Sequence, residues 1–228
     1  MKNRISLNGE WLLKYVDYGS GERFGLHAEE STKGWLTATV PGDVHLDMMA
    51  AGKINDPFYG LESDHCIWME EKDWWYRTIF SAADLLAAEA IHNRIFLQFH
   101  GLDTFAKIYL NGEVIAQHCN MFVPLKVDIT DFLIQGENDL RVCLGSPAYS
   151  PVIHRDSNIA RTPPQRLCSR KAQACYGWDI APRLVTIGIW RPVEILICDA
   201  LEIVFPCVRT NWISESQAEV ELEFTLES

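Results

Sequence analysis

The sequence gathers cations with almost no acids in its least regular stretch, residues 145–173. Five cations there face the single acid Asp156: Arg155, Arg161, Arg166, Arg170 and Lys171. The stretch carries four prolines and shows neither a helical nor a strand period. Loops of this length inside a compact domain are usually functional or disordered. Two interpretations remain open: a functional loop, and a solvated loop whose cations balance neighbouring carboxylates through weak surface ion pairs.

Other polar and aromatic candidates stand singly. We expect Asp103 to hold its loop by accepting hydrogen bonds from backbone amides, and a place in a ligand cleft is the alternative. His45 has no paired carboxylate or second ligand in the sequence pattern, so packing is expected in preference to ligand binding. A cluster of Trp68, Trp74 and Trp75 could form a carbohydrate platform. Large aromatic side chains more often dominate buried contacts, so core or interdomain packing is expected for them.

The composition restricts the classes of partner. The chain has 228 residues, of which 48% are hydrophobic, enough for a full core. Its net charge of −11 argues against nucleic acid or an anionic membrane, because both demand a cationic face. We find neither a signal peptide nor a membrane-spanning run and expect a cytoplasmic protein. Seven cysteines without CxxC pairs or metal-ligand spacing are expected to be free thiols, and no metal or other cofactor is expected.

The elements that would position these residues are short strands separated by turns. In residues 101–118, Ala106, Ile108 and Leu110 share one strand face, and Asn111-Gly112 supplies the two positive-φ residues of a type I′ hairpin turn. Further strands are expected at residues 11–18, 36–40, 74–80, 94–100, 122–127, 139–144, 185–190 and 193–198, and helices at 44–51, capped by Asp43, and at 82–90. Many short strands without βαβ alternation indicate an all-β jelly-roll β-sandwich with short helical insertions.

The last residues depart from this arrangement. Residues 218–227 alternate apolar and polar side chains, as a half-buried strand does. Residues 201–228 are too few for another sandwich of about 100 residues. We therefore expect one domain over residues 1–198 and the truncated start of a second β domain over residues 199–228. The apolar face of the last strand should pack on the first domain, pair with a neighbouring strand or fray.

Ten short motifs occur in one order along the chain. They are LNGxW at 7–11, VPGDVH at 40–45, DPFYG at 56–60, WYR at 75–77, GLDT at 101–104, YLNG at 109–112, NMF at 120–122, RK at 170–171, GWD at 177–179 and GIWR at 188–191. Together they resemble the N-terminal sugar-binding domain of glycoside hydrolase family 2, and more narrowly its β-mannosidase branch. The resemblance covers roughly residues 5–198 and implies a galactose-binding-like jelly roll. Residues 199–228 resemble the opening strands of the immunoglobulin-like domain that follows in that family.

The resemblance also implies where the chemistry is done. Family members are retaining β-glycosidases whose acid/base glutamate, in an Asn-Glu pair, and nucleophilic glutamate lie about 5 Å apart on a barrel farther along the chain. These 228 residues contain no Asn-Glu pair and no barrel-like βα alternation. The resemblance therefore implies a non-catalytic module of a β-mannosidase-like enzyme acting on terminal β-D-mannosides. It would be inactive alone, without a catalytic residue, and its partners would be the carbohydrate and the barrel and immunoglobulin-like domains of the parent chain.

The candidate substrate contacts come from the same resemblance. In the β-mannosidase branch, the loop similar to Trp178-Asp179 reaches into the active-site pocket, where the aspartate binds hydroxyls of the sugar in the −1 subsite. A carboxylate can accept two charge-assisted hydroxyl hydrogen bonds, and an indole offers its face to sugar C–H groups. Arg170 and Lys171 are further candidate contacts. The alternatives are that Trp178 belongs to the core and that Asp179 pairs with Arg170 or Arg183.

Two other functions remain open at this stage. The chain could be an independent carbohydrate-binding module, which sugar binding by the isolated chain would reveal. It could also be a purely structural or oligomerising domain, for example of a homodimer. That alternative expects Asp179→Ala in the full-length enzyme to leave catalytic efficiency unchanged.

Overall fold

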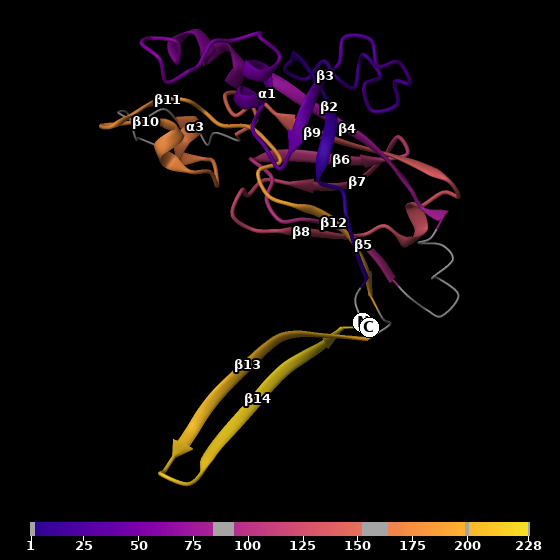
Figure 1. Ribbon diagram of the computed structural model, residues 1–228, viewed down its shortest axis with the longest axis vertical. Helices are drawn as coiled ribbons and strands as arrows, with labels where there is room; N and C mark the ends of the chain where they lie inside the picture. The colour runs from indigo at the N-terminus through magenta and orange to yellow at the C-terminus, as the bar shows by residue number, and fades with distance from the viewer. Residues whose placement is uncertain (1–2, 84–93, 152–163, 199–200, 228) are drawn as a thin grey trace.

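Two antiparallel sheets pack face to face in the computed structural model, which describes residues 3–83, 94–151, 164–198 and 201–227 (Figure 1). One sheet contains β2 (Gly9–Asp17), β3 (Leu36–Val40), β4 (Lys72–Ser81), β6 (Phe105–Leu110), β7 (Glu113–His118) and β9 (Glu137–Gly145), in the spatial order β3-β2-β4-β9-β6-β7. The other contains β1 (Asn3–Ser6), β5 (Arg94–Phe99), β8 (Leu125–Asp128) and β12 (Val193–Cys198), in the order β1-β12-β5-β8. This arrangement confirms the predicted all-β sandwich.

The core lies between the sheets because each strand turns alternate side chains inward. Trp74 and Tyr76 of β4 are fully buried, and so are Ile95 and Leu97 of β5 on the opposite sheet. The first described strand pairs with β12, so that segments from both ends of the sandwich close one sheet. The boundary between residues 198 and 199 stays a prediction.

The predicted hairpin is confirmed in detail. Asn111 and Gly112 have φ values of 54° and 85°, as a type I′ turn requires. Ala106, Ile108 and Leu110 of β6 are buried in the main core. The outer face is also partly covered, which the alternating pattern did not predict: Tyr109 stacks on Trp75 with ring centroids 5.3 Å apart. The segment 18–35 folds over this face, where Leu26 packs with Trp75 and Tyr109 in a second, smaller apolar cluster.

Helical structure is limited. The helix α1 (Val44–Ala50) begins at the predicted cap, where the Asp43 carboxylate accepts a hydrogen bond of 2.8 Å from the His45 backbone N–H. The His45 ring is buried, as expected, but its Nδ1 lies 2.7 Å from Asp43 Oδ1, so a carboxylate partner does exist two residues away. The other described helices are η1 (Asp64–Glu71), η3 (Thr130–Phe132), α3 (Pro164–Leu167) and η4 (Gln173–Cys175). In the described ranges no helix is long and apolar enough to cross a membrane. Most of the predicted helix at 82–90 lies outside the described residues.

The predicted strand at 185–190 was wrong. The segment is irregular, and its one bridge joins Gly188 to Asp103. Val185, Ile187 and Ile189 are nevertheless buried. Backbone bonds of 2.9 Å run from the amides at 42 and 44 to the carbonyls at 189 and 187, so the segment is bonded to the start of α1 and to the loop at 103. The alternating apolar residues of this segment are buried, but its backbone forms a loop and not a strand of either sheet. The predicted strand at 122–127 also begins later, at Leu125.

Beyond the sandwich, β13 (Glu202–Ile213) and β14 (Ala218–Glu227) form a two-stranded ribbon that extends away from the two sheets (Figure 1). Of the three outcomes expected for the last strand, it pairs with a neighbouring strand. Its apolar side chains remain largely exposed, among them Leu222 and Phe224.

Candidate functional site

The short hairpin of β10 (Tyr176–Trp178) and β11 (Ala181–Arg183) carries the predicted contacts Trp178 and Asp179 at its tip. Trp178 is 59% exposed and Ile180 is 96% exposed, and Asp179 between them is also exposed. Trp178 is therefore not part of the core. This result removes one of the two interpretations that the sequence left open for this residue. Gly177, with φ of +97°, allows the strand to turn sharply just before the tip.

The Asp179 carboxylate makes no hydrogen bond or ion pair with any residue that the structure describes. The alternative partner Arg183 instead makes an ion pair of 2.8 Å with Glu70 and donates a hydrogen bond of 3.2 Å to the carbonyl of Tyr176. Arg170 is exposed, and its backbone joins the Asn120 segment through a bridge. Within the described ranges, the tip thus presents a carboxylate without a hydrogen-bond donor.

The indole of Trp178 has a cation beside it. The guanidinium of Arg166, one of the five cations of the irregular segment, lies 4.9 Å from the centroid of the Trp178 ring. A cation over an indole face is attracted by the ring quadrupole. Arg166 also donates a hydrogen bond of 3.0 Å to Gln173 Oε1, which fixes its position. At least one of the five cations of the irregular segment therefore contacts a residue of the hairpin tip.

The base of the hairpin is buried, in contrast to its tip. Tyr176 is 6% exposed, and its hydroxyl lies 3.4 Å from the hydroxyl of Ser169. Burial raises the pKa of Tyr176 to about 12, so its hydroxyl is neutral near pH 7. The Arg183–Glu70 pair joins the second strand of the hairpin to the end of η1. Sequence reasoning missed Glu70 and Ser169, because nothing local in the sequence marks them as partners of the hairpin.

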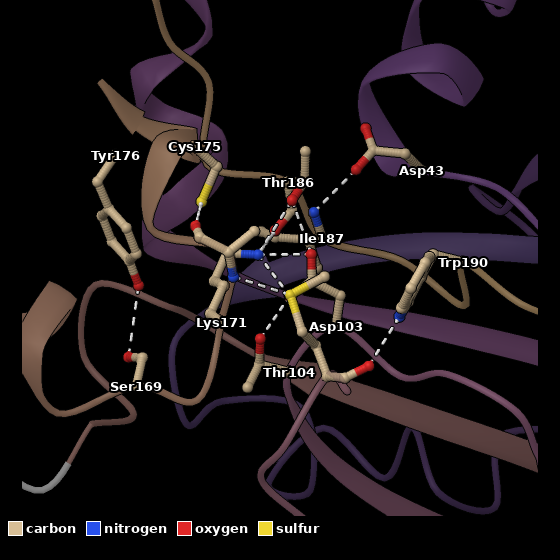
Figure 2. A network of polar contacts seen from close by, with 12 residues as sticks. Asp43, Asp103, Thr104, Ser169, Lys171, Cys175, Tyr176, Thr186, Ile187 and Trp190 are labelled. Carbon is tan, nitrogen blue, oxygen red and sulfur yellow. Dashed lines mark hydrogen bonds and ion pairs between the residues drawn. The ribbon is translucent and has the colours of Figure 1, made fainter. Parts of the chain in front are cut away.

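Lys171 lies in a buried polar network beneath the hairpin (Figure 2). Its ammonium contacts both carboxylate oxygens of Asp103 and donates to the carbonyl and, at 3.1 Å, the hydroxyl of Thr186. The side chains of Lys171 and Asp103 are 0% and 2% exposed. The hydroxyls of Thr186, at 2.7 Å, and Thr104 also donate to the Asp103 carboxylate. Asp103 therefore holds its loop through side-chain partners, and the expected hydrogen bonds to backbone amides were the wrong mechanism.

The network ties together three segments that are distant in sequence. Asp103 comes from the loop before β6, Lys171 from the segment before η4, and Thr186 from the segment that follows β11. The backbone bridge between Asp103 and Gly188 adds bonds of 2.9 and 3.2 Å. Buried opposite charges that are fully hydrogen-bonded hold one geometry, because any displacement exposes an unpaired charge to an apolar interior. Figure 2 shows Lys171, Asp103 and Thr186 together, with Cys175 and Tyr176 nearby.

The structure thus separates the four predicted substrate contacts. Trp178 and Asp179 lie together at the exposed tip, Arg170 is exposed on a neighbouring segment, and Lys171 is enclosed by protein groups. Substrate contact by any of the four remains a prediction. Among the described residues no group of three His, Cys, Asp or Glu side chains is placed to hold a metal ion.

Comparison with known proteins identifies the family to which the chain is similar. A family profile described as glycosyl hydrolase 2 galactose-binding domain-like matches residues 24–191. Beta-mannosidase B of Emericella nidulans is 37% identical over 193 residues, which are 79% of this chain and 22% of that protein. Beta-mannosidase B of Aspergillus terreus is 35% identical over 185 residues, 75% of this chain and 21% of that protein. The chain thus spans about a fifth of the length of these curated relatives.

Solved structures agree with the profile. The crystal structure of the beta-D-mannosidase from Dictyoglomus thermophilum superposes with a TM-score of 0.79 at 34% identity, covering 99% of this chain and 26% of that one. A beta-glucuronidase from an uncultured Clostridium species superposes with a TM-score of 0.67 at 22% identity, which shows a shared fold alone. The family match covers most of the chain, and the sandwich has the shape that the match requires. The chain belongs to the galactose-binding-like domains of glycosyl hydrolase family 2.

Proposed function

We propose that this chain is the N-terminal, non-catalytic module of a retaining β-glycosidase that hydrolyses terminal β-D-mannosides. In this proposal the two catalytic glutamates lie in a part of the parent protein outside these 228 residues. The relatives named beta-mannosidase are four to five times longer than the matched region, which leaves room for a barrel and an immunoglobulin-like domain.

The observation that carries the proposal is the exposed carboxylate of Asp179 beside Trp178, which has no partner among the described residues and lies on a hairpin whose base is buried. A carboxylate can accept two hydroxyl hydrogen bonds at once, and such bonds are stronger because the acceptor is charged. In the proposed arrangement Asp179 accepts from hydroxyls of the sugar in the −1 subsite and Trp178 covers its C–H groups. The chain would complete a pocket whose other walls belong to the barrel.

The test is substitution of Asp179 in the full-length protein. Asp179→Ala and Asp179→Asn should each lower kcat/KM for a 4-nitrophenyl β-D-mannoside, the alanine variant by roughly 30- to 900-fold. That range corresponds to about 2 to 4 kcal/mol of lost transition-state stabilisation. Asp131→Ala, which removes an exposed aspartate from η3, is the matched control and should stay within twofold of the wild type.

The same experiment separates the alternatives. Unchanged kcat/KM in a folded Asp179→Ala variant would reject the proposal and favour a structural or oligomerising role, which sedimentation could then resolve. Calorimetry of the 228-residue chain with mannose addresses the independent binding module: millimolar or tighter binding that survives Asp179→Ala would support a separate carbohydrate site.

We also propose a cytoplasmic location. It rests on the odd number of cysteines, which lack the spacing of a disulfide framework. Fractionation of the source cells with an antibody against the chain would test it, and recovery in the secreted fraction would contradict it.

A further inference from the structure

The motif at residues 56–60 has no part in the proposed pocket, yet together with Leu61 it exposes three large apolar side chains. Phe58 is 77% exposed, Tyr59 is 79% exposed and Leu61 is 74% exposed. Single exposed apolar residues are common, but contiguous apolar patches on soluble domains usually mark contact surfaces. Here three large side chains fall within four residues.

The loop that carries these side chains is ordered by its own hydrogen bonds. The Asp56 carboxylate accepts from the Phe58 amide at 3.0 Å, and its carbonyl accepts from the Tyr59 amide at 3.1 Å. Further turns follow, with bonds of 3.1 Å from Glu62 N to Tyr59 O and 3.0 Å from Asp64 N to Leu61 O. The apolar side chains are therefore held outward by a defined backbone, so that a partner need not order the loop on binding.

Two further apolar side chains, Leu46 and Met49 of α1, are exposed on the same connection between β3 and β4. The start of α1 is bonded to the segment after β11 through Asp43, whose carboxylate accepts from the Ile187 amide at 2.9 Å. The end of η1 is joined to β11 by the Glu70–Arg183 pair described above.

We infer that this surface, named here the α1 face (Leu46, Met49, Phe58, Tyr59, Leu61), docks against the catalytic part of the same parent chain. The inference rests on the proposed function and adds to it the surface that seats the module. Relatives extend far beyond the region that this chain matches, and the D. thermophilum enzyme is about four times as long. A carboxylate that completes a pocket on another domain requires a firm contact close to it, and the α1 face is tied to the hairpin on two sides.

Apolar side chains are also exposed elsewhere, among them Phe24, Phe122 and Ile180. Phe24 is 61% exposed but stands alone among polar neighbours, in the segment that covers the outer face of the six-stranded sheet. The apolar side chains of β13 and β14 belong to the ribbon, which extends away from the sandwich. Phe24 therefore provides an internal control of similar exposure and chemistry.

Hydroxyl-radical footprinting of the full-length, unmodified protein tests the docking without any variant. If the α1 face is covered, Phe58 and Tyr59 should be oxidised at least about fivefold more slowly than Phe24, because a packed interface excludes water. Oxidation of Phe58 and Tyr59 at the rate of Phe24 would overturn the inference. Protection that disappears on dilution, together with dissociation of a dimer in sedimentation, would also overturn it and assign the face to a second copy.

A functional arm uses the same residues. Phe58→Glu/Leu61→Glu in the full-length protein should lower kcat/KM for the β-mannoside more than tenfold, whereas Phe24→Glu should stay within twofold. If the double variant retains full activity and the same footprint as the wild type, the inference fails. Slow oxidation of Phe58 with full activity in Asp179→Ala would support docking and reject the proposed pocket. Rapid oxidation of Phe58 together with an inactive Asp179→Ala variant would reject docking and support the proposed pocket.

Discussion

Lys171→Met isolates the contribution of the buried charge pair beneath the hairpin. The wild-type ammonium contacts both oxygens of Asp103 and the carbonyl and hydroxyl of Thr186, and the two charged side chains are 0% and 2% exposed. Methionine fills nearly the same volume but supplies no charge and no donor. The Asp103 carboxylate would then keep only the hydroxyl donors of Thr104 and Thr186 in an interior that excludes water.

The magnitude follows from this burial. Removing one partner of a buried ion pair costs about 3 to 5 kcal/mol, because the remaining charge is left uncompensated. A domain of this size has a total stability of about 5 to 15 kcal/mol, so the variant would lose a large share of it. Each kcal/mol lowers Tm by about 2 to 4 °C in domains of 150–250 residues, which predicts a drop on the order of 10 °C.

Urea unfolding of the chain, followed by tryptophan fluorescence, measures the loss. Arg4→Met is the control, since the Arg4–Glu194 pair spans 3.5 Å with Arg4 59% exposed, and it should cost less than 1 kcal/mol. The double variant Lys171→Met/Asp103→Asn should recover part of the loss, because no unpaired charge remains. A Lys171→Met variant within 1 kcal/mol of the wild type would refute the reasoning, and so would a double variant less stable than the two single losses added together.

Two further variants test other features of the fold. Burial raises the pKa of Asp47 from 3.8 to about 6, so between these values the folded state holds a proton that the unfolded state releases. Stability relative to Asp47→Asn should therefore fall by about 2 to 3 kcal/mol as the pH rises from 4 to 7; urea midpoints across this range measure it, and a constant difference would contradict the assignment. A Cβ at Gly188 would lie 2.2 Å from the Gly42 carbonyl oxygen and 2.9 Å from Asp43 Cα, both backbone atoms. Gly188→Ala should cost about 1 to 3 kcal/mol in thermal unfolding, and an unchanged Tm would show that the two segments can separate freely.

Regular elements were the part of the fold that the sequence predicted well. The β6–β7 hairpin follows from alternation plus Asn111-Gly112, and α1 follows from the Asp43 cap, because both signals act over a few residues. The segment at 185–190 was assigned to a strand because its apolar spacing matches one. Spacing reports which side chains are buried, and it does not report whether the backbone finds a neighbouring strand or, as here, scattered partners near residues 42–44 and 103.

The site was predicted only in part, for a related reason. Arg170 and Lys171 are adjacent in an irregular segment, so no period indicated that one side chain points to solvent and the other into the interior. The partner of Lys171 is 68 residues earlier in the chain, and that of Arg183 is 113 residues earlier. Local spacing carries no information about contacts of this range. The exposed tip was found because a motif marked it.

The contrast between tip and base bears on how the module could act. If Asp179 were paired with Arg183, a sugar hydroxyl would have to displace the guanidinium, and part of the binding free energy would be lost in breaking that bond. Arg183 instead pairs with Glu70, so it does not compete for the Asp179 carboxylate, and this pair fixes the strand behind the tip. A side chain that binds on a surface shared with another domain must be held within about 0.5 Å of its working position by groups that do not themselves bind the ligand. In this chain the buried Lys171–Asp103 pair, the Tyr176 ring and the Arg183–Glu70 pair are such groups, and none of them would need to move in the proposed contact between a sugar and the tip.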